Sequence, residues 1–161
     1  MGRERVSVAQ LESLYRERYE RFARVAAAVI GDAEAGRDAV QLAFASAIRK
    51  RSSFRGTGSL EAWLWRIVMR EASRLARERP SLPLDEAHEP SANGHQLDEL
   101  GLRAWIATLP ERQRAALFLR YYADLDYRAI AKVLEVEVGT VSATLSAAHT
   151  TLRKALREVE R

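Results

Sequence analysis

Apolar residues recur every three or four positions in three successive windows of the N-terminal half, which is the spacing of amphipathic helices. Each window begins after a residue that caps helices and ends at one that interrupts them. The first start, Ser7–Gln10, is a capping box in which the two side chains satisfy each other's backbone donors. The pattern therefore predicts three helices, with boundaries at Ser7, Gly31, Asp32, Ser59 and Pro80.

The C-terminal half carries shorter windows with the same apolar spacing. One runs from about Leu97 to Thr108, and the next begins at a second capping-box pattern, formed by Thr108 and Glu111. Asp126 suits the N-cap of a short helix that ends in the turn Glu135–Glu137, and a longer helix follows. Two helices joined by so tight a turn predict a helix-turn-helix.

The segment between the halves differs from both. Residues 80–96 hold three of the four prolines and show no helical period, which predicts a linker. No segment alternates apolar and polar residues over a useful length, so no sheet is expected. We therefore predict an all-α protein of two small helical domains. A three-helix bundle at 1–79 and a helix-turn-helix domain at 97–161 are joined by a flexible acidic linker at 80–96.

The net charge of +4 is unevenly distributed along the chain. Residues 1–80 hold 16 Lys and Arg against 10 Asp and Glu, and residues 101–161 hold 10 against 7. Residues 81–100 hold five acidic residues and no Lys or Arg. Two basic blocks separated by an acidic segment favour a polyanionic partner, although solvated Arg-rich helices explain the charge alone equally well.

One side of the third predicted helix is a row of cations, Arg66, Arg70, Arg74 and Arg77. Their spacing of four, four and three residues aligns them on one helix face. Because only two acidic residues lie near them in the sequence, the row is typical of a surface that follows a phosphate backbone.

The sequence argues against several other classes of protein. It has no cysteine and three scattered histidines, so we predict no metal site and no cofactor. No Gly-rich phosphate loop, G-x-S-x-G or H-E-x-x-H motif is present, so we do not expect an enzyme. No signal peptide and no apolar run of membrane-spanning length is apparent, which favours a cytoplasmic protein without membrane contact.

Two blocks of residues resemble a known family. The C-terminal run "LPERQRAALFLRYYADLDYRAIAKVLEVEVGTVSATLSAAHTTLRKAL" resembles region 4 of the extracytoplasmic-function (ECF) group of bacterial RNA polymerase sigma factors. The segments "DAVQLAF" and "FRGTGSLEAWLWRIV" resemble region 2 of the same group. The resemblance covers nearly the whole chain, in the family's order and with a linker where the family has one.

The resemblance implies a dissociable subunit that binds core RNA polymerase and promoter DNA, and that meets an anti-sigma factor. The side chains expected to bind core polymerase are Asp38, Gln41 and Phe44. Those expected to engage and open the minus-ten element are Phe54, Arg55, Trp65, Arg66, Arg70, Arg74 and Arg77. Aromatic side chains beside cations suit unpaired bases and phosphates. Trp63 shares the apolar stripe and is expected in the core, whereas Trp65 is expected to be exposed.

The predicted DNA-reading helix departs from the family. From Val138 to Leu152 it holds no Lys, Arg, Asp or Glu, and Glu135 stands where the turn usually has glycine. The polar residues left for DNA contact are Thr140, Ser142, Thr144 and Ser146. Either these hydroxyls read the minus-thirty-five element weakly, or the helix packs on protein instead.

The second option leads to a different function, a sigma-like interaction protein that binds polymerase, a sigma factor or an anti-sigma factor. A helix-turn-helix regulator that acts without polymerase is a third option, which the family-like region 2 argues against.

Overall fold

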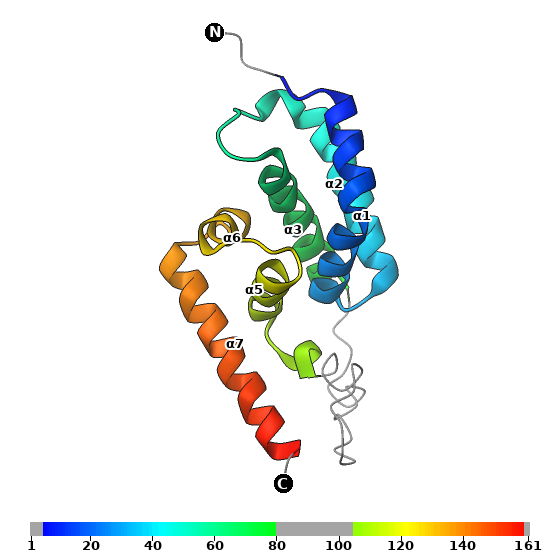
Figure 1. The fold of residues 1–161 in the computed structure, drawn as a ribbon. Coiled ribbons are helices and arrows are strands. Elements are labelled where there is room, and N and C mark those ends of the chain that lie inside the picture. Colours follow the sequence, from blue (N-terminus) through cyan, green and yellow to red (C-terminus); the bar gives the residue numbers. More distant parts are fainter. Residues whose placement is uncertain (1–4, 80–104, 160–161) are drawn as a thin grey trace.

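The computed structural model describes residues 5–79 and 105–159, and every regular element in these residues is a helix (Figure 1). The N-terminal domain contains α1 (Val8–Ile30), α2 (Ala33–Lys50), the short 3₁₀ helix η1 (Arg51–Ser53) and α3 (Leu60–Glu78). The C-terminal domain contains a helical turn at 105–108, α5 (Glu111–Tyr121), α6 (Tyr127–Leu134) and α7 (Val138–Val159). The predicted all-α fold with two helical domains is confirmed.

The predicted starts of the three N-terminal helices and the predicted end of the first are confirmed, whereas Pro80, the predicted end of the third, lies outside the described residues. Ser7 and Gln10 form both hydrogen bonds of the capping box, at 2.8 and 3.1 Å. The Asp32 carboxylate and the Ser59 hydroxyl accept the backbone N–H three residues on, at 2.8 and 3.0 Å. Gly31 ends α1 with a φ of +86°, a left-handed conformation that glycine adopts at little cost. Local side-chain chemistry therefore sets these boundaries.

Large aromatic residues fill the core of the N-terminal domain. The ring of Phe22 lies 4.4 Å from that of Trp65 and 5.6 Å from that of Phe44, measured between centroids. Helices α1 and α2 approach closely at Gly36, where an added Cβ would lie 2.7 Å from the backbone N of Ala27. Each of the three helices thus contributes an aromatic ring or a close backbone contact to one packed core.

The C-terminal domain has the predicted helix-turn-helix form. Asp126 caps α6 through the backbone N–H of Ala129 at 2.8 Å, as expected. Val141, Leu145 and Ala148 are buried on the side of α7 that faces the rest of the domain, and α7 packs against α5 and α6. The opposite side of α7 is left for other contacts.

The predicted capping box at Thr108 and Glu111 is wrong. Helix α5 begins after Pro110 without a side-chain cap, and the Thr108 hydroxyl instead donates to the carbonyl of Trp105 at 2.7 Å. Thr108 belongs to the end of the preceding helical turn, so it serves that turn. The predicted linker at 80–96, and the residues from Leu97 to 104 of the predicted helix, lie outside the described residues.

The two domains touch at two places. Helix α5 packs on α1, and α6 packs on α3 (Figure 1). At the first contact, the half-buried guanidinium of Arg114 donates to the carbonyls of Ala28 and Val29 at 3.1 and 2.9 Å. Burial lowers the pKa of Arg114, but four backbone carbonyls surround the group and satisfy its donors. Nearby, Arg24 donates to the hydroxyl of Tyr122 and lies over its ring.

Candidate nucleic-acid interface

The outer face of α2 presents two of the three residues expected to bind polymerase. Asp38 and Gln41 are exposed on this face. Phe44 is only 6% exposed and packs against the rings of Tyr15 and Phe22, so the expectation that it contacts a partner is corrected. Phe44 lies six residues after Asp38, and that separation carries it round the helix to the side that faces the core.

Two apolar side chains on α2 are exposed. Leu42 is 42% exposed and Ile48 is 39% exposed. Ile48 follows the fully buried Ala47 near the end of α2. Exposed apolar residues beside polar ones are common at the core of protein interfaces.

The loop before α3 carries the first predicted DNA contacts. Phe54 is half-buried and meets the ring of Trp63 edge-on at 5.6 Å, while Arg55 is exposed. Gly56 and Gly58 both have positive φ, at +71° and +93°, so the loop turns sharply twice between these aromatic residues. The loop therefore holds an aromatic pair beside a cation.

The expected exposure of Trp65 is wrong, and the aromatic residue on the open side is Trp63. Trp65 is fully buried against Phe22, and its indole N–H has no hydrogen-bond partner within the described part of the chain. Trp63 is half-buried at the edge of the core. The two faces of α3 were misassigned because α3 packs on both α1 and α2, so its buried face is wider than one stripe.

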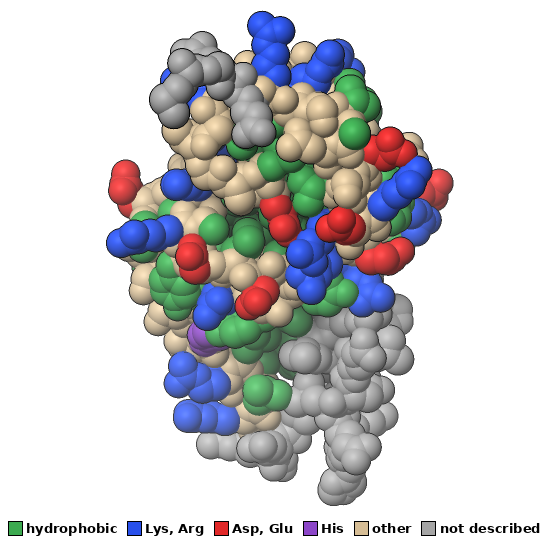
Figure 2. Space-filling model, turned by 45° about the horizontal axis from the view of Figure 1, so that its top comes forward, with side chains coloured by type: hydrophobic (Ala, Val, Ile, Leu, Met, Phe, Trp, Pro, Cys, Tyr) green, Lys and Arg blue, Asp and Glu red, His purple; other side chains and the backbone are tan. Residues whose placement is uncertain are grey.

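The arginine row of α3 lies along the surface as predicted, but carboxylates hold most of it. Arg74 pairs with Glu71 at 2.8 Å and with Glu78 at 3.0 Å, and these pairs raise its pKa. Arg77 is exposed near the end of the helix. On the face of the molecule drawn in Figure 2, acidic side chains lie beside basic ones rather than apart from them. The row is therefore not a bare cationic surface.

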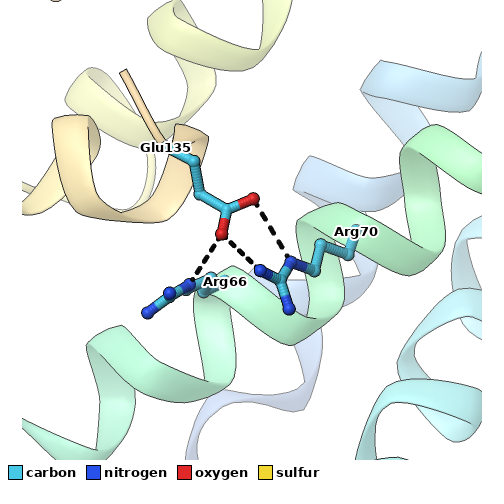
Figure 3. A network of polar contacts seen from close by, with 3 residues as sticks. All are labelled: Arg66, Arg70 and Glu135. Carbon is cyan, nitrogen blue, oxygen red and sulfur yellow. Dashed lines mark hydrogen bonds and ion pairs between the residues drawn. The ribbon is translucent and has the colours of Figure 1, made fainter. Parts of the chain in front are cut away.

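Arg66 and Arg70 are held from the other domain by Glu135 (Figure 3). Glu135 Oε1 accepts from Arg66 Nε at 3.2 Å, and Oε2 accepts from Arg70 Nε at 3.3 Å, with a further bond from Arg70 Nη2 to Oε1. The hydrogen bonds from Arg70, and then those from Arg66, hold the pKa of Glu135 below its ordinary value. The side chains remain about half exposed, so solvent screens the pairs.

Glu135 also has the backbone conformation that the sequence suggested. It ends α6 with a φ of +57°, in the left-handed region where a side chain is disfavoured and glycine is usual. Its carboxylate is directed back onto α3, where Arg66 and Arg70 donate to it.

A cleft of about 740 Å³ is lined by residues of the loop before α3, of α3 and of α6. The aromatic pair Phe54 and Trp63 lines it. The cations that line it come from both domains and are Lys50, Arg55, Arg66, Arg70, Arg128 and Lys132. The carboxylates on its lining are Glu71 and Asp126, and Asp126 serves as a helix cap. Aromatic rings among so many cations suit an anionic, base-bearing polymer. Sequence reasoning missed Arg128 and Lys132, because only folding brings α6 to α3.

The exposed side of α7 holds the four hydroxyl residues expected to read DNA. Thr140, Ser142 and Ser146 are exposed, and Thr144 is half-buried. The Thr144 hydroxyl already donates to the carbonyl of Thr140 at 2.7 Å, which removes its donor from outside contacts. Thr150 and Thr151 bond backward in the same way, at 3.0 and 3.1 Å. Thr140, Ser142 and Ser146 therefore remain the candidates for DNA contact on this helix.

The described residues hold no cluster of three or more His, Cys, Asp or Glu side chains that could bind a metal ion. His149 bonds to the hydroxyl of Tyr121 at 2.9 Å, where it links α7 to α5. Among the helices that the structure describes, none is long and apolar enough to cross a membrane.

Sequence comparisons match both domains. Residues 14–80 match the family described as Sigma-70 region 2, and residues 100–157 match Sigma-70, region 4. The RNA polymerase sigma-H factor of Pseudomonas aeruginosa is 30% identical over 151 residues, covering 82% of this chain and 78% of the relative. The ECF RNA polymerase sigma factor SigM of Mycobacterium tuberculosis is 28% identical over 149 residues, covering 90% of this chain and 76% of the relative.

Solved structures share the fold. The sigma factor RpoE of Bartonella quintana, in complex with the anti-sigma factor NepR, superposes with a TM-score of 0.72 over 93% of this chain and 98% of that one. CnrH, in complex with the cytosolic domain of CnrY, gives a TM-score of 0.71 over 94% of this chain and 90% of that one. Both are 20% identical to this chain, so these likenesses concern the fold alone.

Proposed function

The chain belongs to the ECF group of bacterial RNA polymerase sigma factors, and from this premise we propose how its surfaces divide the work of promoter recognition. As a sigma factor it directs promoter-specific transcription initiation by binding core polymerase and promoter DNA. Region 2, within residues 1–79, supplies the polymerase contact and most of the affinity for DNA. Region 4, within residues 97–161, adds only a weak upstream contact.

The polymerase contact is assigned to the outer face of α2. Asp38 and Gln41 are exposed there, beside the exposed apolar side chain of Leu42. A polar rim around an apolar centre is the usual composition of a protein interface. Phe44 supports this face from beneath, since it fills the core under the helix.

The DNA contact of region 2 is assigned to the loop before α3 and the cation row of α3. The observation that carries this assignment is the aromatic pair, with Phe54 and Trp63 at 5.6 Å beside Arg55 and Arg66 on one cleft. Unpaired bases stack on aromatic rings, and the cations offset the phosphate charge. Trp63 therefore takes the role that was expected of Trp65.

The uncharged face of α7 supports a second candidate function. A sigma-like interaction protein would bind polymerase, or a sigma or anti-sigma partner, without reading the minus-thirty-five element. The absence of any Lys or Arg from Val138 to Leu152 favours it, because a phosphate contact normally needs a cation. Partners of either kind place the protein in the cytoplasm, and we assign it no catalytic activity of its own.

Reconstitution with core RNA polymerase tests the assignment. The purified chain is mixed with core enzyme, and transcripts are measured from the region upstream of its own gene. Specific transcripts support the sigma function, whereas tight binding without transcripts from any promoter tested favours the interaction protein. No binding to the polymerase contradicts both.

A matched pair of variants tests the polymerase face. Changing Asp38→Ala together with Gln41→Ala is expected to weaken binding to core polymerase by about tenfold, a typical cost of losing central polar contacts. Glu20→Ala, a change of an exposed carboxylate on α1, should leave that affinity unchanged. Equal losses in both variants would contradict the assignment.

A further inference from the structure

Glu135 joins two unusual features at one position. Its backbone has a left-handed φ of +57°, which glycine would adopt more easily. Its carboxylate nevertheless accepts hydrogen bonds from two arginines of the other domain, Arg66 and Arg70. A residue that is unfavourable for the local turn therefore makes the polar contact between α6 and α3 (Figure 3).

The charges around Glu135 give this contact a particular importance. A second hollow is lined by three cations, Arg66 on α3 and Arg128 and Lys132 on α6, and by two carboxylates, Glu135 and Glu137. The approach of α6 to α3 thus brings cations of one domain towards cations of the other. The Glu135 carboxylate lies among them, so its loss would remove an attraction and leave a repulsion.

The arginine pair offers a site for an anion. Guanidinium groups bind the oxygens of carboxylates and phosphates through the same parallel N–H donors. In this structure Arg70 uses two of its nitrogens on the two oxygens of Glu135, while Arg66 adds a third donor. A DNA phosphate that approached Arg66 and Arg70 would need the donors that Glu135 occupies.

We infer that Glu135 is an intramolecular competitor of DNA, which fills the anion site of Arg66 and Arg70 while the two domains are closed on each other. The inference rests on the proposed role of α3 in DNA binding. Region 4 must then leave α3 before these two arginines contact phosphate. The chain thereby lowers its own affinity for DNA until something separates its domains.

The strength of the contact suits a reversible latch. The three side chains are about half exposed, so each ion pair adds little and is screened by salt. Pairs of this kind shift an equilibrium by about two- to fivefold each. The contact of Arg114 with the carbonyls of Ala28 and Val29 holds the opposite edge of the domain interface and is independent of Glu135.

Three variants separate charge from backbone strain. Glu135→Gln keeps the side-chain size and the strained backbone but removes the charge. Glu135→Gly removes both the charge and the strain. Glu137→Gln makes the same change of net charge two residues further on, at an exposed position in the same turn.

The first measurement is the distance between the domains in the protein alone. Because the chain has no cysteine, Ser13→Cys on α1 and Thr151→Cys on α7 give two unique sites for spin labels. Both Glu135 variants should broaden and lengthen the distance distribution, and Glu137→Gln should match the parent. Unchanged distributions in both Glu135 variants would overturn the latch without any bearing on the sigma function.

The second measurement is binding of a fluorescent single-stranded DNA, taken from the region upstream of the chain's own gene, without polymerase. The Glu135 variants should bind it about two- to tenfold more tightly than the parent, and more tightly than Glu137→Gln. Domains that open without this gain would overturn the competition with DNA. Combining Glu135→Gln with Arg66→Ala and Arg70→Ala should abolish the gain, and a gain that persists would likewise overturn it.

Discussion

Helix α3 and the first half of α7 are the two helices expected to face DNA, and their exposed sides differ in chemistry. On α3, Arg66, Arg70, Arg74 and Arg77 line one side, whereas α7 exposes hydroxyl and methyl groups. Both helices are anchored by buried apolar faces, so packing does not explain the difference. Charge for phosphate contact is concentrated on this side of α3, where three of the four arginines are already paired with carboxylates.

This comparison shows that the number of cations on a helix does not decide how many of them are available to bind DNA. Arg74 is paired within its own helix, so its partners stay with it whatever the domains do. Arg66 and Arg70 are paired across the domains, so their availability depends on domain position. The paired arginines on this face are therefore of two kinds: Arg74 stays paired whatever the domain arrangement, whereas Arg66 and Arg70, the releasable pair, lose their partner when the domains separate.

Removal of the releasable pair should have the largest effect. Arg66→Ala combined with Arg70→Ala is expected to lower promoter binding by the polymerase-bound protein by about 100-fold, since charge-assisted hydrogen bonds contribute about 1.5–3 kcal/mol each. Binding of the holoenzyme to promoter DNA measures it. Arg16→Ala combined with Arg157→Ala, two exposed arginines on α1 and α7, serves as the control of equal charge. A similar loss in the control would mean that net charge alone is responsible.

Two glycines allow the tight packing of the region 2 bundle to be compared with the exposed start of α7. Gly36→Ala should destabilise region 2 by about 1–3 kcal/mol, because its Cβ would lie under 3.0 Å from the backbone of Ala23 and Ala27. Gly139→Ala has nothing within 4 Å and should be neutral or stabilise α7 by about 0.5 kcal/mol. Denaturant unfolding of each variant measures both effects. Equal destabilisation by the two changes would contradict the described packing at Gly36.

Adding cations to α7 should reduce the difference between the two helices. Ser142→Lys with Ala147→Arg places two charges on the exposed side, and binding to duplex upstream DNA should tighten by roughly tenfold. The slope of log affinity against log salt should steepen by about 0.9 for each new phosphate contact. Ser13→Lys with Ala9→Arg on α1 adds the same charge elsewhere. If both pairs act alike, the exposed side of α7 does not face DNA.

Of the changes considered, a moderate fall in pH should have the smallest effect on the ion pairs between Glu135 and the releasable pair, Arg66 and Arg70. Arg70 and Arg66 lower the pKa of Glu135, so its ion pairs are present above the ordinary value of 4.5 and are lost only as the pH falls through the lowered pKa. Arg128 and Lys132 on α6 and Glu137 in the following turn are the other charged groups that line the same hollow. The distance between labels on α1 and α7 should therefore stay constant from about pH 8 to about pH 5. A transition near pH 6.5 would point to a histidine instead.

The sequence alone determined the features that depend on neighbours in the chain. The caps at Ser7, Asp32, Ser59 and Asp126 were predicted and are present, because a capping side chain bonds a backbone N–H only three residues away. The left-handed turn at Glu135 followed from the family resemblance, in which glycine usually occupies this position. The family, and with it the domain order, followed from motifs that are themselves local.

Only the tertiary structure decided which side chains are free to act. Trp65 and Phe44 were expected at surfaces and are buried, because a helix packed on two neighbours hides more than one stripe. Thr108 lost its predicted cap to a competing carbonyl nearby. Arg66 and Arg70 share one partner, Glu135, which lies 69 and 65 positions away in the sequence. Sequence spacing predicts the faces of a helix, but the positions of its neighbours decide which faces remain open.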